Sequence, residues 1–268
     1  REARKLTRVV DQNWGEGHRD RSRRKTRTVN WDHVMTVTAL DRRFYPHLSD
    51  NWDNRLLRRQ IEAEVTPGAV VLDLGAGAGI VPEMDLRALG VTVIGVDPDP
   101  RVLENPYLDV AHVARGEALP LANESVDLAV ACNVLEHLPD PLGVFREVRR
   151  VLRPGGAFLA KTPNRWHYVP LIASLTPHRF HQWVNEKRGR SSADTYPTLY
   201  RANSPGRIRQ LARKAGFSSC EVRCYEGRPE YLRFHPLLYL AGVGYERLVN
   251  RFSALQYLRV VMIAAMRR

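Results

Sequence analysis

A short apolar run that breaks into a glycine-rich turn constrains this chain more than any other feature. Residues 70–74 read Val-Val-Leu-Asp-Leu, and Gly75, Gly77 and Gly79 follow directly. An apolar, β-branched run of this length predicts a buried strand of a parallel sheet. Glycines after such a strand let backbone N–H groups approach a ligand closely, just ahead of a helix N-terminus. We therefore expect a ligand-binding turn followed by a helix over residues 80–89, and a tight turn without a ligand is the alternative.

A second apolar run places a carboxylate near this turn. Residues 91–96 predict another buried strand, which ends at Asp97. A carboxylate at the tip of the second strand, roughly 20 residues past the glycines, can accept hydrogen bonds from both ribose hydroxyls of a nucleoside. A dinucleotide and S-adenosylmethionine (SAM) both fit such a site. The dinucleotide fingerprint requires a glycine where Ile80 stands, so the spacing favours SAM.

Three later segments continue the alternation of strand and helix. Residues 114–121 follow a third strand, residues 126–139 form a fourth strand and its exit, and residues 147–159 form a helix, a Pro-Gly-Gly turn and a fifth strand. In this order and spacing, residues 65–162 resemble the class I SAM-dependent methyltransferases, with a looser match over 204–268. The resemblance is greatest to the small-molecule branch typified by ubiquinone- and menaquinone-biosynthesis enzymes. It implies an α/β fold with a doubly wound, seven-stranded, mostly parallel, Rossmann-like sheet.

The resemblance also implies a SAM site residue by residue. The glycine turn runs past the methionine end of the ligand, and Asp73 holds that end in place. Asp97 binds the ribose hydroxyls. The further cofactor-binding candidates are Gly75, Ala76 and Gly77 in the turn, Pro98 beside the ribose-binding acid, Glu117 and Ala118 at the adenine, and Asn133 near the sulfonium. A purely structural role at a strand end is the alternative, and it stays most open for Glu117 and Asn133.

His137 is the candidate catalytic residue. It follows the fourth strand, on the side that faces the donor methyl group in related enzymes, and histidine can act as a base near neutral pH. A residue at a helix start, in the Leu138-Pro139 turn, is the alternative. Some related RNA-terminus methyltransferases hold a divalent metal with a Glu-His pair and an earlier Glu. Asn133 stands at that earlier position here, so we expect no metal.

The sequence divides into five parts by composition and periodicity. We expect a flexible basic arm, a helical cap that includes an amphipathic helix, a SAM-binding core, a lid or substrate insertion, and the last part of the methyltransferase fold. Their bounds are 1–30, 31–64, 65–164, 165–203 and 204–268, and the last part contains an apolar insertion at 227–256.

The insertion after the fifth strand is rich in aromatic, histidine and arginine side chains and lacks clear periodicity. A long segment of this kind at the carboxyl edge of a sheet is often a lid or substrate-binding loop. The substrate-binding candidates are Trp166, His167, His178, His181 and Tyr200. A structural excursion without contact to the substrate is the alternative.

The last part predicts one helix and two strands. Ser204-Pro205 is typical of a helix start and Gly216 of its end. Residues 217–225 and 259–266 predict antiparallel strands that complete the sheet. The apolar, aromatic residues 230–252 between them fit either the core or a pocket wall, or a helix lying on a membrane surface.

Charge is unevenly distributed along the chain. The net charge is +12, of which residues 1–30 carry +6, residues 31–152 carry −8 and residues 153–268 carry +14. An acidic cofactor region suits the cationic sulfonium of SAM, and a basic remainder raises the local concentration of anionic partners. A solvated, arginine-rich surface without a partner is the alternative.

Cysteine content and hydropathy indicate the compartment. Three cysteines suggest a reducing environment without disulfides, and Cys220 and Cys224 read as two small residues on one face of a strand. No apolar stretch approaches the ~18 residues of a membrane span. We therefore expect a cytoplasmic protein, with peripheral contact to a membrane as a second expectation.

The leading hypothesis for function is a SAM-dependent methyltransferase that modifies oxygen, nitrogen or carbon of a small-molecule or lipid-linked, anionic acceptor. An RNA methyltransferase is the second hypothesis, because of the basic arm, although no RNA-binding module is recognisable. A non-catalytic partner protein with the same fold is the third, and a nicotinamide-dependent dehydrogenase is a distant fourth. The sequence gives no indication of the oligomeric state.

Overall fold

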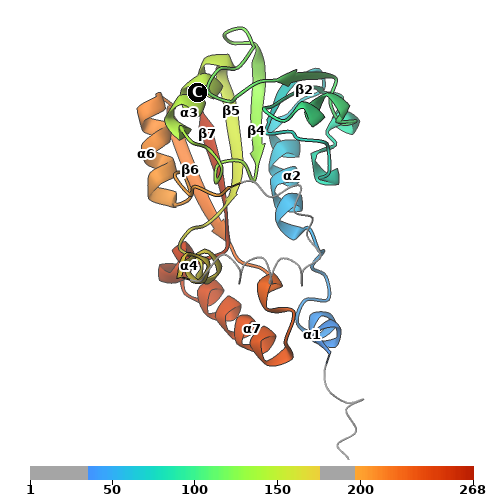
Figure 1. The fold of residues 1–268 in the computed structure, drawn as a ribbon, viewed down its shortest axis with the longest axis vertical. Helices are drawn as coiled ribbons and strands as arrows, with labels where there is room; N and C mark the ends of the chain where they lie inside the picture. The colour runs from blue at the N-terminus through green and yellow to red at the C-terminus, as the bar shows by residue number, and fades with distance from the viewer. Residues whose placement is uncertain (1–35, 176–196) are drawn as a thin grey trace, which may run out of the picture. The chain divides into compact units, whose positions relative to one another are not determined.

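The computed structural model describes residues 36–175 and 197–268, and seven strands in these ranges form one sheet (Figure 1). The strands are β1 (Val70–Leu74), β2 (Thr92–Asp97), β3 (Val110–Val113), β4 (Val126–Cys132), β5 (Leu152–Pro163), β6 (Ser219–Tyr225) and β7 (Val261–Arg267). Their order is β3-β2-β1-β4-β5-β7-β6, and β7 alone runs antiparallel to its two neighbours. The predicted seven-stranded, mostly parallel sheet is confirmed.

Helices pack on both faces of this sheet. The α-helices are α1 (Val37–Phe44), α2 (Trp52–Glu64), α3 (Pro141–Val151), α4 (Tyr168–Leu175), α6 (Pro205–Ala215) and α7 (Pro236–Arg251). Shorter 3-10 turns are η2 (Pro82–Met84), η3 (Arg87–Leu89), η4 (Pro100–Glu104), η6 (Glu230–Leu232) and η7 (Ser253–Leu258). Leu72 of β1 is buried in a core with α3 and α6, whereas its neighbour Val71 is buried in a second core with α2. Alternate strand residues therefore build two hydrophobic cores, as a doubly wound sheet requires.

The prediction of a helix over residues 80–89 is wrong. The segment forms two 3-10 turns, η2 and η3, instead of an α-helix. The guanidinium of Arg58 on α2 donates hydrogen bonds to the carbonyl oxygens of Glu83 (3.2 Å) and Asp85 (2.5 Å). The Asp85 carboxylate in turn accepts from the backbone and guanidinium of Arg87. These contacts occupy backbone carbonyl and amide groups that would bond to each other in a continuous helix.

The last part of the fold follows the sequence prediction closely. The hydroxyl of Ser204 caps α6 by accepting from the amide of Arg207, and Gly216 ends the helix with φ +90°. The two strands β6 and β7 pair antiparallel, and Cys220 and Cys224 face the same core. Both the helix and the closing antiparallel pair are therefore confirmed.

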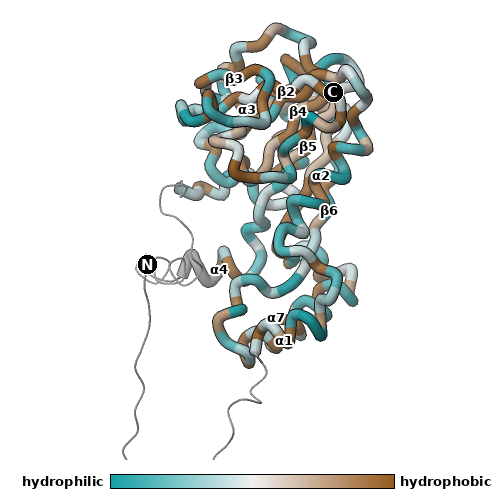
Figure 2. The backbone as a smooth tube through the Cα atoms, turned by 90° about the vertical axis from the view of Figure 1, so that its right-hand side faces the viewer, coloured by the Kyte–Doolittle hydropathy of each residue, from teal (hydrophilic) through white to brown (hydrophobic). Residues whose placement is uncertain are grey.

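α1 and α7 form a third, smaller core. Leu40 of α1 packs with Tyr239 and Val243 of α7. The buried Asp41 carboxylate accepts from the Tyr239 hydroxyl and from the Arg233 guanidinium (2.6 Å). The apolar insertion therefore holds a helix with one buried face, and Figure 2 shows apolar colouring along α7 as well as along the strands. Within the described ranges no helix is long and apolar enough to cross a bilayer.

Candidate functional site

The candidate site lies where the parallel strands end. β1, β2, β4 and β5 run in the same direction, so the residues that follow them meet at one edge of the sheet. β6 shares this direction because it pairs antiparallel with β7, which pairs antiparallel with β5. In open α/β sheets, ligands bind at this carboxyl edge.

The turn after β1 needs its glycines for backbone conformation and for space. Gly75 and Gly77 have φ values of +75° and +49°, in the left-handed region that other residues rarely adopt. A Cβ atom on Gly75 would lie 2.4 Å from the Val134 side chain, whereas one on Gly77 would meet nothing within 4 Å. The turn is therefore packed tightly on one side, and Gly77 leaves room on its own side.

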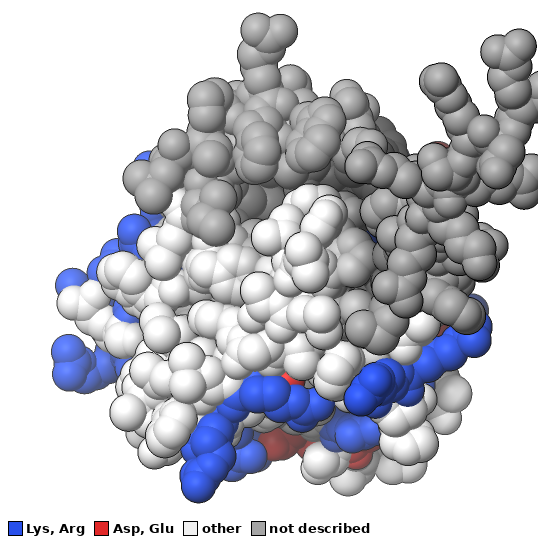
Figure 3. All heavy atoms as spheres, turned by 90° about the horizontal axis from the view of Figure 1, so that it is seen from below, with Lys and Arg blue, Asp and Glu red and all other residues white. Residues whose placement is uncertain are grey.

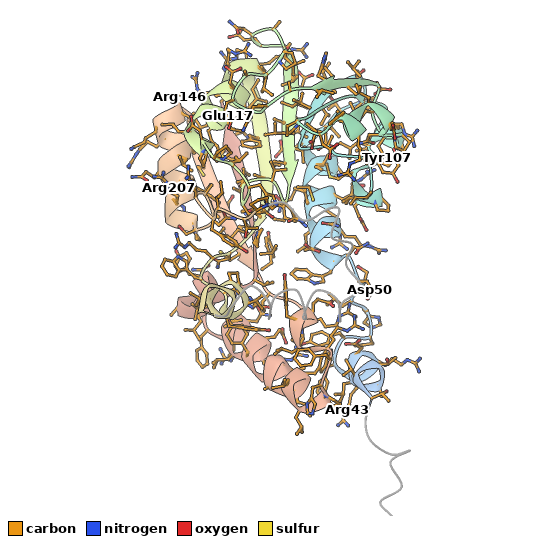
Figure 4. The ribbon with its side chains drawn as sticks, viewed as in Figure 1. Arg43, Asp50, Tyr107, Glu117, Arg146 and Arg207 are labelled. Atoms are coloured by element: carbon orange, nitrogen blue, oxygen red, sulfur yellow. The ribbon has the colours of Figure 1, made fainter. Side chains whose placement is uncertain are left out.

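Asn105 holds this turn in place, although the sequence carries no motif that marks it. Its buried side-chain amide donates to the carbonyl oxygens of Ala76 (3.0 Å) and Gly77 (3.2 Å). Its oxygen accepts from the amide of Tyr107 (2.9 Å), and its side chain fills the space where Gly79 lacks a Cβ. Figure 4 shows Tyr107 on the side of the sheet that carries β2.

Asp97 connects the end of β2 to the same turn. Its carboxylate accepts hydrogen bonds from the amides of Gly77 (3.0 Å) and Asp99 (2.8 Å). Pro98 lies between these acids, at the start of the loop that leads into η4. The predicted ribose-binding acid therefore lies directly beside the predicted methionine-binding turn.

Asp73 is a buried carboxylate near Asp97. Burial, with a smaller contribution from the negative charge of Asp97, raises the pKa of Asp73 to about 7. Among the described residues, no hydrogen bond to its carboxylate is found. A cation placed beside this group would lower its pKa and favour the ionised form. The site therefore fits a cationic ligand such as a sulfonium.

The remaining cofactor candidates lie at the ends of β3 and β4. Glu117 lies beside α3 (Figure 4). A Cβ atom added to Gly143 of α3 would lie 3.5 Å from the Cγ atom of Glu117. The amide of Ala118 donates to the carbonyl of Arg115 (3.0 Å). Asn133 adopts φ +58°, which is unusual for a residue with a side chain, and is exposed at the tip of β4. The cofactor candidates thus lie at the ends of β1 and β2 or in the loops that follow β1, β2, β3 and β4.

His137 lies beyond the end of β4. Its Nδ1 is 2.9 Å from the carbonyl oxygen of Pro197, and its Nε2 is 4.0 Å from the carboxylate of Glu136. A carbonyl oxygen can only accept, so Nδ1 carries the proton in this contact. In the neutral ring, Nε2 then holds the lone pair that a general base requires.

A buried network behind His137 supports the segment that begins at residue 197. The Glu136 carboxylate accepts from the Thr162 hydroxyl (2.9 Å), which accepts from the Asn203 amide (2.6 Å). The Glu136 carbonyl accepts from the amides of Leu199 (2.7 Å) and Tyr200 (3.1 Å). Burial raises the pKa of Glu136. Glu136, Thr162 and Asn203 were not among the sequence candidates, and only the Glu-His dipeptide could have drawn attention to this place.

The substrate-binding candidates that the structure describes differ in their surroundings. Trp166 is exposed, and the Arg165 guanidinium lies 5.3 Å from its ring centre. Tyr200 lies at the Glu136 network with φ +51°, and His178 and His181 lie outside the described residues. Their role in substrate binding stays a prediction.

His167 is instead enclosed by the rings of Tyr168 and Tyr245, at centroid distances of 4.1 and 5.6 Å. Its Nε2 is 3.5 Å from the buried carboxylate of Glu226. Burial lowers the pKa of His167 to about 3 and raises that of Glu226 to about 8. Burial therefore favours the neutral form of both groups, and His167 packs against Tyr245 of α7.

Lys161 is a further buried charge at this edge. Its ammonium group pairs with the carboxylate of Asp53 (2.6 Å) and contacts the side-chain oxygen of Asn54, both on α2. Cys132 donates to the same Asn54 oxygen at 3.6 Å, and burial raises the pKa of its thiol to about 11. This cluster fixes the start of α2 to the carboxyl edge. No cluster of metal-binding side chains occurs in the two described ranges.

Comparisons with known sequences identify what this chain resembles. Residues 72–160 match a family described as methyltransferase domain. Proteins described as uncharacterized methyltransferases from Mycobacteroides abscessus and Mycobacterium sp. strain JLS are 34% and 40% identical, over 171 and 165 residues. Each alignment covers 58% of this chain and 65% of the relative. The chain thus spans slightly less than two thirds of the length of these relatives.

Solved structures share the fold at low sequence identity. A phosphoethanolamine N-methyltransferase from Haemonchus contortus, solved with phosphomonomethylethanolamine and S-adenosylhomocysteine, gives a TM-score of 0.53 at 17% identity, covering 89% of this chain and 59% of that one. A SAM-dependent methyltransferase from Archaeoglobus fulgidus gives 0.53 at 15% identity, covering 86% and 99%. These likenesses concern the fold.

Proposed function

Since the chain belongs to the class I SAM-dependent methyltransferase superfamily, we propose that it transfers a methyl group from SAM to oxygen, nitrogen or carbon of a small-molecule or lipid-linked, anionic acceptor. One observation carries the donor half of this proposal. Asp73, Asp97 and the glycine turn meet at the ends of β1 and β2, and the buried Asp73 carboxylate has no hydrogen-bond partner among the described residues. A sulfonium supplies the compensating positive charge and an activated methyl group.

The protein groups divide the remaining tasks. Asp97 accepts hydrogen bonds from ribose hydroxyls, and Asn105 keeps the turn in shape for the methionine end. His137 accepts the proton that an O–H or N–H acceptor loses as its bond to the methyl carbon forms and the carbon–sulfur bond breaks. Alignment of donor and acceptor and exclusion of water supply most of the rate acceleration in such a displacement.

The anionic character of the acceptor is supported by two exposed arginines beyond β4 and β5. Arg165 stacks beside Trp166, and its amide donates to the carbonyl of Asn203 (2.9 Å). Arg201 donates to the carbonyl of Pro139 (2.5 Å). The Arg201 guanidinium therefore reaches the loop that follows His137, and the Arg165 guanidinium lies over the Trp166 ring. Guanidinium groups suit phosphate and carboxylate oxygens because they donate two parallel hydrogen bonds.

The test uses SAM with a radiolabelled methyl group, the purified full chain and fractionated host extract. Label in the organic phase supports a lipid-linked acceptor, and label in the aqueous small-molecule pool supports a soluble metabolite. Label in RNA contradicts the proposal and favours a nucleic-acid methyltransferase. No label, with SAM binding confirmed by calorimetry, contradicts it in favour of a partner protein that keeps the fold without catalysis. An Asp97→Ala variant in the same extract measures the background from contaminating enzymes.

A further inference from the structure

α7 carries two apolar stripes, and the residues that the structure describes bury only one of them. Tyr239, Val243 and Val249 lie on the inner stripe. Leu237, Ala241, Gly244 and Leu248 are exposed and recur at intervals of four, three and four residues, which places them on one outer face. Leu237 is 71% exposed and Leu248 49%. A helix that is apolar on both sides is normally covered on both.

The exposed charges of α1 and α7 all have the same sign. Each helix contains one carboxylate, Asp41 or Glu246, and both carboxylates are buried. The exposed charged residues of the two helices are arginines: Arg42, Arg43, Arg247 and Arg251. Figure 3 shows Lys and Arg side chains gathered along the edge of a broad uncharged area at this end of the molecule.

Three of these arginines extend over aromatic rings beside them. The guanidinium carbons of Arg43, Arg247 and Arg251 lie 5.7–5.8 Å from the ring centres of Phe44, Tyr45 and Phe252 respectively. Cationic heads over aromatic and apolar surface are typical of helices that lie in the interface between water and lipid.

We propose that the outer face of α7, with the arginines of α1 and α7, binds the surface of a bilayer that contains anionic phospholipids. In this arrangement Leu237 and Leu248 enter the acyl boundary and the arginines contact lipid phosphates. A second copy of the chain fits less well, because a symmetric contact would bring arginines against arginines. RNA fits less well because exposed leucines gain little from phosphate contacts.

This surface is separate from the methyl-transfer site. Tyr245 of α7 contacts Tyr168 and His167, whereas Leu237 and Leu248 are exposed on the outer face, and the SAM-binding candidates lie at or beyond the ends of β1 to β4. Substitutions on the outer face therefore leave the SAM-binding residues unchanged. A failure of membrane binding and a failure of methyl transfer are thus measured independently.

The experiment is flotation of the full chain with vesicles of phosphatidylcholine alone or mixed with phosphatidylglycerol. Three double variants are compared with wild type: Leu237→Gln with Leu248→Gln, Arg43→Glu with Arg251→Glu, and the charge-matched control Arg146→Glu with Arg213→Glu on α3 and α6. Figure 4 shows Arg43 and Arg146 at opposite ends of the drawing. Circular dichroism and SAM affinity confirm that each variant folds, and every sample keeps residues 1–35 unchanged.

We expect wild type to bind only the anionic vesicles. The leucine pair and the α1–α7 arginine pair should each lower partitioning by about tenfold, and the control pair by less than about twofold. Equal binding to both vesicle types, no binding, or an equal loss in the control pair would overturn the proposal. The proposal would also be overturned if the leucine-pair variant lost dimerisation or RNA binding while its vesicle binding stayed unchanged. If the leucine pair does not fold, the arginine pair at exposed positions decides.

Discussion

The carboxylate of Asp97 accepts a hydrogen bond from the amide of Gly77 at 3.0 Å, so the end of β2 and the turn after β1 form one unit. The two segments are 20 residues apart in sequence and contribute the acid and the glycine turn that a nucleoside-containing cation requires. Residues at either end of this contact are therefore the most direct points at which to test the site.

Replacing Asp97 by alanine should weaken SAM binding by about 100-fold, because two charge-assisted hydrogen bonds to the ribose are lost. Isothermal calorimetry measures the affinity, and thermal unfolding checks the fold. The matched control is Asp109→Ala, which removes a carboxylate that accepts from the amide of Val93 on the same strand. Unchanged affinity in the Asp97 variant would remove the ribose assignment.

Asp73→Asn should stabilise the chain above neutral pH while weakening SAM binding. The folded pKa of Asp73, about 7, lies above its ordinary value, so the folded state binds more protons than the unfolded state between about pH 4 and 7. Wild-type stability therefore falls as pH rises through this window, and asparagine removes that loss. At about pH 8 the gain should be roughly 2–4 kcal/mol, and at about pH 4 close to zero.

Denaturant unfolding of wild type and variant at both pH values measures this difference. Because other titrating groups are common to both proteins, the difference isolates Asp73. SAM affinity of wild type should rise over the same pH range, since the ionised carboxylate binds the cation. A stability difference that does not change with pH would show that Asp73 is ionised throughout.

Asn105→Ala should lower SAM affinity by about tenfold with a small effect on folding. The variant loses the two hydrogen bonds that fix the carbonyls of Ala76 and Gly77, so the turn samples other conformations before it binds. Asn123→Ala is the control, because the Asn123 side-chain oxygen accepts from the Arg150 guanidinium (2.8 Å) and no contact between it and the glycine turn is found among the described residues. Equal SAM affinity in both variants would show that the glycine turn keeps its shape without Asn105.

His137→Gln should lower kcat by about 10²- to 10⁴-fold on an O–H or N–H acceptor and leave SAM affinity unchanged. The loss should be larger at low pH than at high pH, where the acceptor loses its proton without help. His47→Gln, in the exposed segment between α1 and α2, serves as the control. A kcat close to wild type would exclude His137 as the base.

The strands were predictable because buried parallel strands leave continuous apolar runs. The placement of Asp73 and Asp97 at one edge of the sheet was predictable because parallel strand ends converge there, and their roles toward a ligand stay a prediction. The composition of residues 80–89 is compatible with a helix, so the sequence alone did not reveal that this prediction was wrong. The carbonyls of this segment are held by Arg58, a residue of another helix, 25 and 27 positions earlier. Local pattern contains no information about such a partner.

The supporting residues of the site were unpredictable for the same reason. Asn203 and Thr162 are 41 positions apart, and Lys161 and Asp53 are 108 apart. Each is a polar residue whose role depends on the one group that the fold brings beside it. The left-handed backbone of Tyr200, with φ +51°, likewise has no signature in the sequence.

Direct titration of the wild-type chain with SAM, S-adenosylhomocysteine and NAD in a calorimeter tests the central claim most directly. The donor site at the ends of β1 and β2 predicts one SAM molecule bound per chain, competition by S-adenosylhomocysteine, and no heat from NAD. Binding of NAD in preference to SAM, or no binding of SAM at all, would contradict the assignment of the glycine turn and its two carboxylates.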